Sequence, residues 1–269
     1  MIKLIKNFGW LLIYLLIGLI SLFPLLWGLK TSLTPTYDYG ILPEYFTLEH
    51  YKTIFQNEVL YKYFFNSIKV SFGSIIIIIP LALIAAYGLS RFKFRGKNVI
   101  SISFLILPLL PSSAILVPIV SYFNKLHLYN TIWGVIIAVS VFNISLSIWM
   151  LRNFIDNTPR AIEEAALIDG LSSMGTLFRV TLPMIKPGLI SVIIYIFINT
   201  WNNYTFSYAL TTSPDARVLS QAILAFIGSW GTNWGGLTAM GIIMIIPPVL
   251  FFLLFQKSFI AGMFGESLK

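Results

Sequence analysis

Apolar residues along this chain gather in long runs that are separated by shorter polar intervals. Six of these runs are long enough, or nearly so, to cross a hydrocarbon layer of about 30 Å as helices. The runs that we expect to span a membrane cover residues 10–29, 66–89, 99–123, 131–151, 188–210 and 237–255. The pattern therefore predicts an all-α polytopic membrane protein with six transmembrane helices, in one domain that covers residues 1–269.

The third apolar run contains three prolines, Pro108, Pro111 and Pro118. Because proline lacks the backbone donor of a helix interior and clashes with the preceding turn, each of them is expected to kink or break the helix. A membrane helix tolerates such a break where neighbouring helices satisfy the freed carbonyl groups. We therefore expect the third span to be bent.

Composition agrees with a membrane protein and narrows the chemistry that it can carry out. Of the 269 residues, 57% are hydrophobic and only 10% are charged, which excludes an ordinary soluble domain. The absence of cysteine excludes disulfides and thiolate chemistry. The two histidines, His50 and His127, lie far apart in the sequence with no cluster of acidic residues around them, so we expect no metal site.

The basic residues predict the orientation in the membrane. With a cytoplasmic N-terminus, twelve of the 18 Lys and Arg residues fall on the cytoplasmic side, in agreement with the positive-inside rule, which the opposite orientation violates. These twelve residues are Lys3, Lys6, Arg91, Lys93, Arg95, Lys97, Arg152, Arg160, Arg179, Lys186, Lys257 and Lys269. The basic turn 91–97 is typical of a topology anchor, so neither this turn nor the net charge of +8 indicates a nucleic-acid partner. Both termini and the interval 158–187 are therefore expected in the cytoplasm.

This interval, residues 158–187, is the one long polar stretch between apolar runs. Thr158 is a good N-cap and Pro159 suits the first helical position, so we expect a helix over residues 160–168. Gly170 tolerates a positive φ and is expected to end this helix together with the preceding aspartate. A second short helix should follow it, capped by one of the next two serines and ended by prolines.

The first of these short helices has an unusual surface. Ala165 and Ala166 carry almost no side chain, so another surface can approach the helix backbone closely. Glu163, Glu164 and Asp169 surround this small patch with charge. On composition alone, a solvated amphipathic loop between two spans explains the same residues.

The spacing within the interval favours a more specific interpretation. It resembles the EAA signature of bacterial ABC-importer permeases, with Glu164-Ala165-Ala166, three residues, Gly170, nine residues, Val180, one residue, and Leu182-Pro183. The one departure is Val180, where the family usually has isoleucine. The flanking stretches 149–152 (WMLR) and 201–202 (WN) resemble the carbohydrate branch, related to the inner-membrane permeases of maltose transporters. The resemblance covers the chain from about Asn66 to its C-terminus.

The resemblance implies the fold and partners of a type I ABC importer permease in a bacterial or archaeal inner membrane. In that family the first short helix is a coupling helix, which docks on a separate ATP-binding subunit through a cytoplasmic loop, here about residues 153–187. The coupling residues carried over are Glu163, Glu164, Ala165, Ala166, Asp169, Gly170 and Pro183. The implied partners are a second homologous permease, two ATP-binding subunits, an extracytoplasmic solute-binding protein and membrane lipid.

The chain itself has no motif for binding a nucleotide or for catalysis. No G-x-x-x-x-G-K-[ST] loop is present to hold phosphates, so we expect no cofactor in this chain, with ATP and Mg bound by the partner subunits. The interiors of the spans carry no acidic residue, which argues against a proton- or sodium-coupled secondary transporter, although broken helices can also form ion sites. An intramembrane enzyme would need paired His, Cys or carboxylate groups that the spans lack.

The expected substrate pathway lies in the fifth apolar run, which contains several polar residues near its middle. The candidates are Asn199, Trp201, Asn202, Asn203 and Tyr204. Amides beside an aromatic ring suit sugar hydroxyls and sugar C–H faces, but amides also join membrane helices by hydrogen bonds. The family often has an acidic residue where Asn203 stands, and in some relatives only the partner permease binds sugar. The chain is thus expected to import a sugar or oligosaccharide, with glycerol phosphate or another polar solute as the alternative, because the binding protein largely selects the solute.

The predicted topology can be tested by cysteine labelling, since the chain has no native cysteine. In intact cells a Ser173→Cys variant should be shielded from membrane-impermeant thiol reagents, because residue 173 is expected in the cytoplasm. A Ser213→Cys variant should react, because residue 213 is expected outside. Reversed labelling would overturn both the orientation and the assignment of the interval to coupling.

Overall fold

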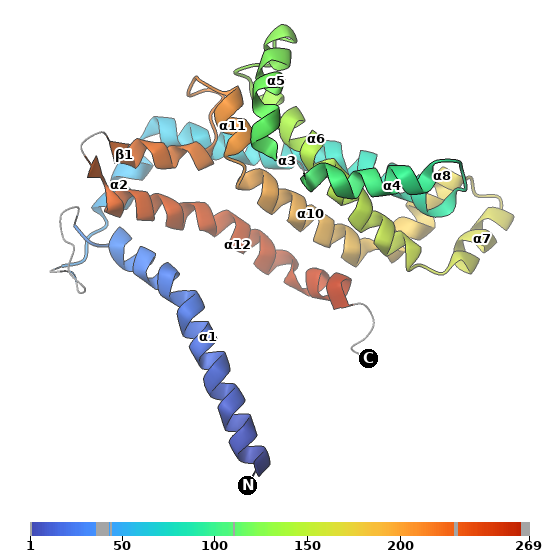
Figure 1. The fold of residues 1–269 in the computed structure, drawn as a ribbon, viewed down its shortest axis with the longest axis horizontal. Helices are drawn as coiled ribbons and strands as arrows, with labels where there is room; N and C mark the ends of the chain where they lie inside the picture. Colours follow the sequence, from blue (N-terminus) through green and yellow to red (C-terminus); the bar gives the residue numbers. More distant parts are fainter. Residues whose placement is uncertain (1, 36–42, 44, 110, 229–230, 265–269) are drawn as a thin grey trace. The chain divides into compact units, whose positions relative to one another are not determined.

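The computed structural model describes residues 2–35, 43, 45–109, 111–228 and 231–264 of the chain, and the regular secondary structure of this part is helical apart from one short hairpin. Lys269, which the orientation argument counts as cytoplasmic, lies outside the described residues. The elements, coloured along the chain in Figure 1, are α1 (Ile2–Ser32), α2 (Glu49–Gln56), α3 (Glu58–Arg91), α4 (Lys97–Ile106), the 3₁₀ turn η1 (Leu107–Leu109), α5 (Ser112–Lys125), α6 (Ile132–Asp156), α7 (Arg160–Ile168), α8 (Ser173–Thr176), the π-helical segment η2 (Leu177–Thr181), α9 (Leu182–Met184), α10 (Lys186–Trp201), α11 (Thr205–Leu210), the 3₁₀ helix η3 (Leu219–Phe226), β1 (Ile227–Gly228), β2 (Gly231–Thr232) and α12 (Trp234–Phe264).

The chain divides into two compact units, which are described separately. One unit comprises Met1–Tyr61 and Ala222–Ile246, and the other comprises Lys62–Gln221 and Pro247–Lys269. The single domain expected from the sequence stays a prediction.

The first unit is held around a buried histidine. The Nε2 atom of His50 on α2 lies 2.9 Å from the carbonyl oxygen of Thr34, just beyond α1. Gly235 at the start of α12 lies against the same imidazole, where a Cβ atom would overlap the ring. His50 is therefore a core residue with a satisfied ring nitrogen. Most side chains of α1 are exposed and apolar, as expected of a helix that faces lipid or another subunit.

Two hydrophobic clusters form the core of the second unit. One joins α3, α6, η2 and α10 around residues such as Ile78, Leu151 and Leu177. The other joins α3, α5, α6 and α11 around residues such as Val135 and Phe206. Helix α6 also packs directly on α4 and on α10 (Figure 1). Since α3 and α6 contribute to both clusters, these two helices connect the two ends of the unit.

The described helices agree with the predicted membrane spans in number and in most positions. Four helices are long and apolar enough to cross a membrane, and six spans result if each of two bent helix pairs counts as one. The third predicted span, 99–123, is such a pair, with residues 97–109 and 112–125 at 96° to each other. Pro111 stands directly before α5 in an extended conformation, so the bend expected from the prolines is confirmed.

The fifth predicted span, 188–210, is wrong as one continuous helix. Helix α10 ends at Trp201, and α11 begins only at Thr205. At 16 residues, α10 is about 24 Å long, which is less than the hydrocarbon thickness. On its other side α10 meets the helical run 173–184 at 84°. Consequently Asn199, Asn202 and Asn203 do not share one helix face, because the last two lie in the break.

The packing of α6 on α10 can be tested at Gly188, in the first turn of α10. A Cβ atom there would overlap the Cγ and Cδ atoms of the Phe154 ring on α6. These ring atoms lie close to the backbone of Phe154, so a small rotation of the side chain does not remove the overlap. We expect Gly188→Ala to destabilise the purified protein by about 1–3 kcal/mol, as for other overpacked sites. Thermal unfolding in detergent measures this loss, and Gly88→Ala is the matched control, because a Cβ atom at Gly88 meets no atom within 4 Å. Equal stability of the two variants would contradict the described packing.

Candidate functional site

Helix α7 has the bounds that the sequence predicts, Arg160–Ile168, but its first turn begins differently. Pro159 occupies the N-cap position in an extended conformation, and no side chain caps the helix. The prediction that Thr158 is the N-cap is therefore wrong. The Thr158 hydroxyl instead donates a 2.7 Å hydrogen bond to the carbonyl of Ile155 and accepts one of 2.6 Å from Arg91. Tertiary contacts have thus replaced the local cap.

The end of α7 and the start of the next helix follow the sequence signals. Gly170 has a φ of +91°, so the expected positive φ at this turn is confirmed. The hydroxyl of Ser172 accepts a 3.1 Å hydrogen bond from the backbone N–H of Gly175 and caps α8. Helices α8, η2 and α9 then form one nearly continuous run that ends at Met184, one residue after Pro183.

The two faces of α7 differ in what they contact. Glu163 and Ala166, three residues apart, are buried within the protein. Glu164, Ala165 and Asp169 are exposed, and the side chain of Ile168 is 86% exposed. The predicted coupling residues thus separate into an inner pair and an outer set. Only the outer set is available to another subunit.

Glu163 forms a buried ion pair with Arg91, the last residue of α3. The Nε atom of Arg91 donates to Glu163 Oε2 and its Nη2 atom donates to Oε1, both at 2.8 Å. The two side chains are only 9% and 5% exposed. A bidentate guanidinium–carboxylate pair of this kind fixes orientation as well as distance. Arg91 therefore locks the inner face of α7 in one position.

The environment of Glu163 keeps its carboxyl group ionised. Burial by itself raises the pKa of Glu163, because a low-dielectric surrounding disfavours the charged form. The hydrogen bonds and positive charge of Arg91 act in the opposite direction and prevail, with smaller contributions from the hydroxyls of Thr181 and Thr158. The pKa of Glu163 therefore lies below its ordinary value.

Further polar contacts surround this pair and tie three helices together. Ser90, next to Arg91 on α3, donates a hydrogen bond to Asp156 at the end of α6. Arg152, one turn earlier on α6, forms an ion pair of 3.3 Å with Asp156 and donates a 2.6 Å bond to the hydroxyl of Ser101 on α4. Hydrogen bonds and an ion pair thus join the ends of α3, α4 and α6 near the start of α7.

Sequence reasoning missed Arg91 as a site residue and treated it as part of a topology anchor. Helical spacing does place Glu163 on one face with Ala166, and Glu164 on another with Ile168, but it does not show which face is covered. Once the face with Glu163 is known to be covered, its carboxylate needs a cationic partner. The sequence did not indicate which of the many basic residues this partner is.

The predicted substrate residues have different surroundings. Trp201 is buried, and its ring lies 5.8 Å from that of Phe64 and 5.7 Å from that of Phe197, between centroids. Asn199, Asn202 and Tyr204 are exposed at the end of α10 and in the break that follows. The structure therefore places Trp201 in the core, and it leaves two amides and one phenol accessible at the break.

Asn203 stabilises the break itself. Its backbone carbonyl accepts hydrogen bonds from the hydroxyls of Ser207 at 3.0 Å and of Ser220 at 2.9 Å. Ser220 belongs to the segment that follows α11, and this segment is anchored on α3, where the Ser67 hydroxyl accepts a 2.8 Å bond from the N–H of Leu219. The side-chain Oδ1 atom of Asn203 also accepts a 3.4 Å bond from the backbone N–H of Ser207, so both its backbone and its side chain have structural roles.

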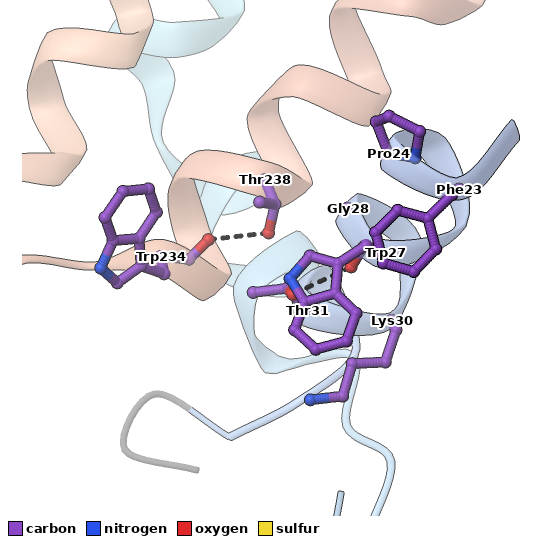
Figure 2. A pocket seen from close by; sticks show the side chains of 8 residues that line it. All are labelled: Phe23, Pro24, Trp27, Gly28, Lys30, Thr31, Trp234 and Thr238. Carbon is purple, nitrogen blue, oxygen red and sulfur yellow. Dashed lines mark hydrogen bonds between the residues drawn. The ribbon is translucent and has the colours of Figure 1, made fainter. Parts of the chain in front are cut away.

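The described part of the chain also contains cavities away from these residues. One of about 590 Å³ in the first unit is shown in Figure 2, where side chains of α1 and of the start of α12 line it. Its lining is mainly apolar, with Trp27 and Trp234 as the largest side chains and the Nζ atom of Lys30 5.2 Å from the centroid of the Trp27 ring. Another cavity, of about 620 Å³ in the second unit, is lined partly by Lys69, Trp133 and Asp215. None of the predicted substrate residues lines either cavity.

Comparisons with known proteins agree with this architecture. The family model described as "Binding-protein-dependent transport system inner membrane component" matches residues 78–265. The chain is similar to the inner membrane ABC transporter permease protein YcjP of Escherichia coli, with 32% identity over 93% of this chain and 92% of the relative. It is also similar to the trehalose/maltose transport system permease protein MalG of Thermococcus litoralis, with 32% identity over 95% of this chain and 94% of the relative. Among solved structures, a chain of a bacterial ABC transporter involved in alginate import matches with a TM-score of 0.76 and 23% identity, over 94% of this chain and 97% of that chain, which shows a shared fold.

The buried ion pair predicts a stability difference between two adjacent glutamates. Glu163→Gln keeps the size of the side chain but leaves the guanidinium of Arg91 without a counter-charge, and breaking one side of a buried pair typically costs about 3–5 kcal/mol. Glu164→Gln, on the exposed face, should change stability by less than about 0.5 kcal/mol. Thermal unfolding of the purified variants measures both changes. Equal effects of the two substitutions would contradict the burial of Glu163.

The pH dependence of the same variant provides the control. Because the pKa of Glu163 is lower in the folded than in the unfolded protein, the ionised pair contributes its stability above the unfolded pKa. This contribution is lost as the pH falls through the unfolded value and then through the folded one. Acidification should therefore lower the melting temperature of the wild type more than that of Glu163→Gln.

Proposed function

Since this chain belongs to the family of binding-protein-dependent transport system inner membrane components, we propose that it forms half of the membrane pathway of an ABC importer for a sugar or oligosaccharide. The observation that supports this most is the exposed face of α7, a helix of nine residues outside the apolar spans. Its inner face is anchored by a buried ion pair, and its outer face offers Glu164 and the apolar side chain of Ile168.

Coupling to ATP hydrolysis is assigned to this outer face. Ala165 leaves space for a close approach to the helix backbone, Glu164 and Asp169 supply charged acceptors, and Ile168 supplies an apolar contact. Gly170 turns the chain directly behind the contact with its positive φ. Closure of two ATP-binding subunits would move α7 together with the run from α8 to α9, and that run meets α10 at 84°.

A neutral polyhydroxylated solute suits the accessible residues at the break after α10. Asn199, Asn202 and Tyr204 carry amide and phenol groups, which hydrogen-bond hydroxyls and stack on sugar C–H faces. Segment 188–210 contains no lysine or arginine, whereas a phosphorylated solute would favour such groups. The name of the Thermococcus relative, a trehalose/maltose permease, agrees with a sugar.

The proposed assembly contains subunits for the functions that this chain does not supply. It contains a second, homologous permease for the other half of the pathway, two ATP-binding subunits that hold ATP and Mg, and an extracytoplasmic solute-binding protein. The chain lies in the inner membrane of a bacterium or archaeon with both termini in the cytoplasm, as the twelve basic residues on that side favour. It carries out no chemistry of its own.

Reconstitution of the complex tests the proposed function. Purified with its partner subunits and supplied with the binding protein and its co-purified ligand, the complex should import that ligand into liposomes only with ATP. The chain alone should move no solute under a proton or sodium gradient. Ion-driven uptake by the chain alone would establish the secondary-transporter alternative instead.

A charge reversal on the outer face tests the coupling assignment within that complex. Glu164→Lys should weaken docking of the ATP-binding subunits, because loss of one charge-assisted hydrogen bond costs about 1.5–3 kcal/mol, or about ten- to a hundredfold in affinity. Glu164→Gln, which keeps the size and an acceptor, should have a smaller effect. The measurements are uptake and substrate-stimulated ATP hydrolysis, and normal values of both in Glu164→Lys would remove this face from the pathway of coupling.

A further inference from the structure

Helices α3 and α7 are distant in sequence and joined by one side chain. Arg91 and Glu163 are separated by 72 positions, whereas α6 and α7 are connected directly through residues 157–159. Within the described part of the chain, the hydrogen bonds between α3 and α7 all come from the Arg91 guanidinium. By contrast, the most extensive close backbone contacts of α7 are with α8 and η2. The covalent chain thus attaches α7 to α6 and to α8, and Arg91 attaches it to α3.

The same guanidinium also contacts the connection between α6 and α7. Its Nη2 atom donates to the carbonyl of Ile155 at 2.8 Å and to the hydroxyl of Thr158 at 2.6 Å. Ile155 belongs to the last turn of α6, and Thr158 lies between α6 and α7. Arg91 therefore contacts α7, the last turn of α6 and the connection between them. Its bidentate bond to Glu163 through Nε and Nη2 needs the planar fork of an arginine, which a lysine lacks.

We propose that Arg91 is a positioning residue for energy coupling, which transmits the displacement of the coupling helix α7 to the membrane span α3 through its bidentate bond to Glu163. This inference rests on the proposed function of α7. A helix that is pushed from outside moves its neighbours only if the contact between them resists sliding. The Arg91–Glu163 pair supplies such a contact, because both groups are buried and separating them would leave two unpaired charges.

Arg91 connects α7 to a helix that is part of the apolar core. Arg91 ends α3, and the preceding residues Ala86, Tyr87 and Leu89 belong to the cluster that also contains Leu177 of η2 and Ile155 of α6. A displacement of α7 that reaches Arg91 thus acts on a helix that passes through both clusters of the second unit. By this route α3 moves together with α6 and with the run that leads to α10.

The test compares two arginine variants in the reconstituted complex. Arg91→Met removes the link, and Arg95→Met is the matched control, because Arg95 is an exposed arginine of the same basic turn. The readout is the number of ATP molecules hydrolysed per solute molecule imported, normalised to the amount of assembled complex. We expect Arg91→Met to raise this ratio at least about fivefold, the low end of typical coupling between sites, with Arg95→Met near the wild type. A merely structural role of Arg91 would lower the amount of complex and leave the ratio unchanged, and that result would overturn the proposal.

A double variant separates the lost link from the effect of an orphaned charge. In Arg91→Met/Glu163→Gln no unpaired carboxylate is buried, yet the link is still absent, so the ratio should stay as high as in Arg91→Met. A return to the wild-type ratio would overturn the proposal, because the orphaned charge would then explain the first result. If the wild-type complex itself shows no ATP-dependent uptake, the proposed function fails; if it is coupled and Arg91→Met matches Arg95→Met, only the role of Arg91 fails.

Restoring the link chemically provides the complementary test. The chain has no native cysteine, so an Arg91→Cys/Glu163→Cys variant can be bridged by a bifunctional thiol reagent in a complex whose other subunits lack cysteine. Electrophoresis of a variant cleaved between positions 91 and 163 measures the bridged fraction. Bridged complexes should regain at least part of the wild-type ratio. Bridged complexes that remain as uncoupled as the unbridged ones would overturn the proposal.

Discussion

A buried charge must be paired, and in this protein that constraint fixes where helix α7 can lie. Glu163 on the inner face of α7 is buried, so its carboxylate is tolerable only against Arg91. Arg91 in turn occupies the end of α3, and the Nη2 group that binds Glu163 also contacts the carbonyl of Ile155 and the hydroxyl of Thr158. The pair thereby sets the position of α7 relative to two spans. The exposed face of α7 is presented outward as a consequence.

The short helices that follow α7 are held by apolar packing. Leu177 of η2 is fully buried in the same cluster as Leu151 and Ile155 of α6. The π-helical geometry of η2 adds a residue to the turn, and such segments often accompany functional sites. An ion pair therefore fixes α7, and apolar packing fixes the short helices that follow it.

Local signals in the sequence predicted the parts of this site that depend only on local chemistry. The bounds of α7 follow from a proline before it and a glycine after it, and Gly170 adopts the positive φ that its position suggests. Thr158 was misassigned as a cap, because a distant arginine recruits its hydroxyl. Glu163 was expected at the docking surface with Glu164, since one sequence cannot show which face of an isolated helix is covered. Arg91 was read as an anchor, because hydropathy and charge counts carry no information on contacts across 72 positions.

The break after α10 shows the same limit of sequence-based prediction within an apolar segment. Hydropathy extends the fifth span to residue 210, because Phe206, Ala209 and Leu210 continue the apolar residues that precede Trp201. A helix can stop inside such a stretch only where its freed backbone groups find partners. The hydroxyls of Ser207 and Ser220 satisfy the carbonyl of Asn203, and the second of these serines belongs to a segment anchored on α3. The polar residues that suggested a ligand therefore divide into one that maintains the break, Asn203, and others that the break exposes. An interruption that is stabilised in this way leaves the amides of Asn199 and Asn202 and the phenol of Tyr204 exposed at the end of a short helix.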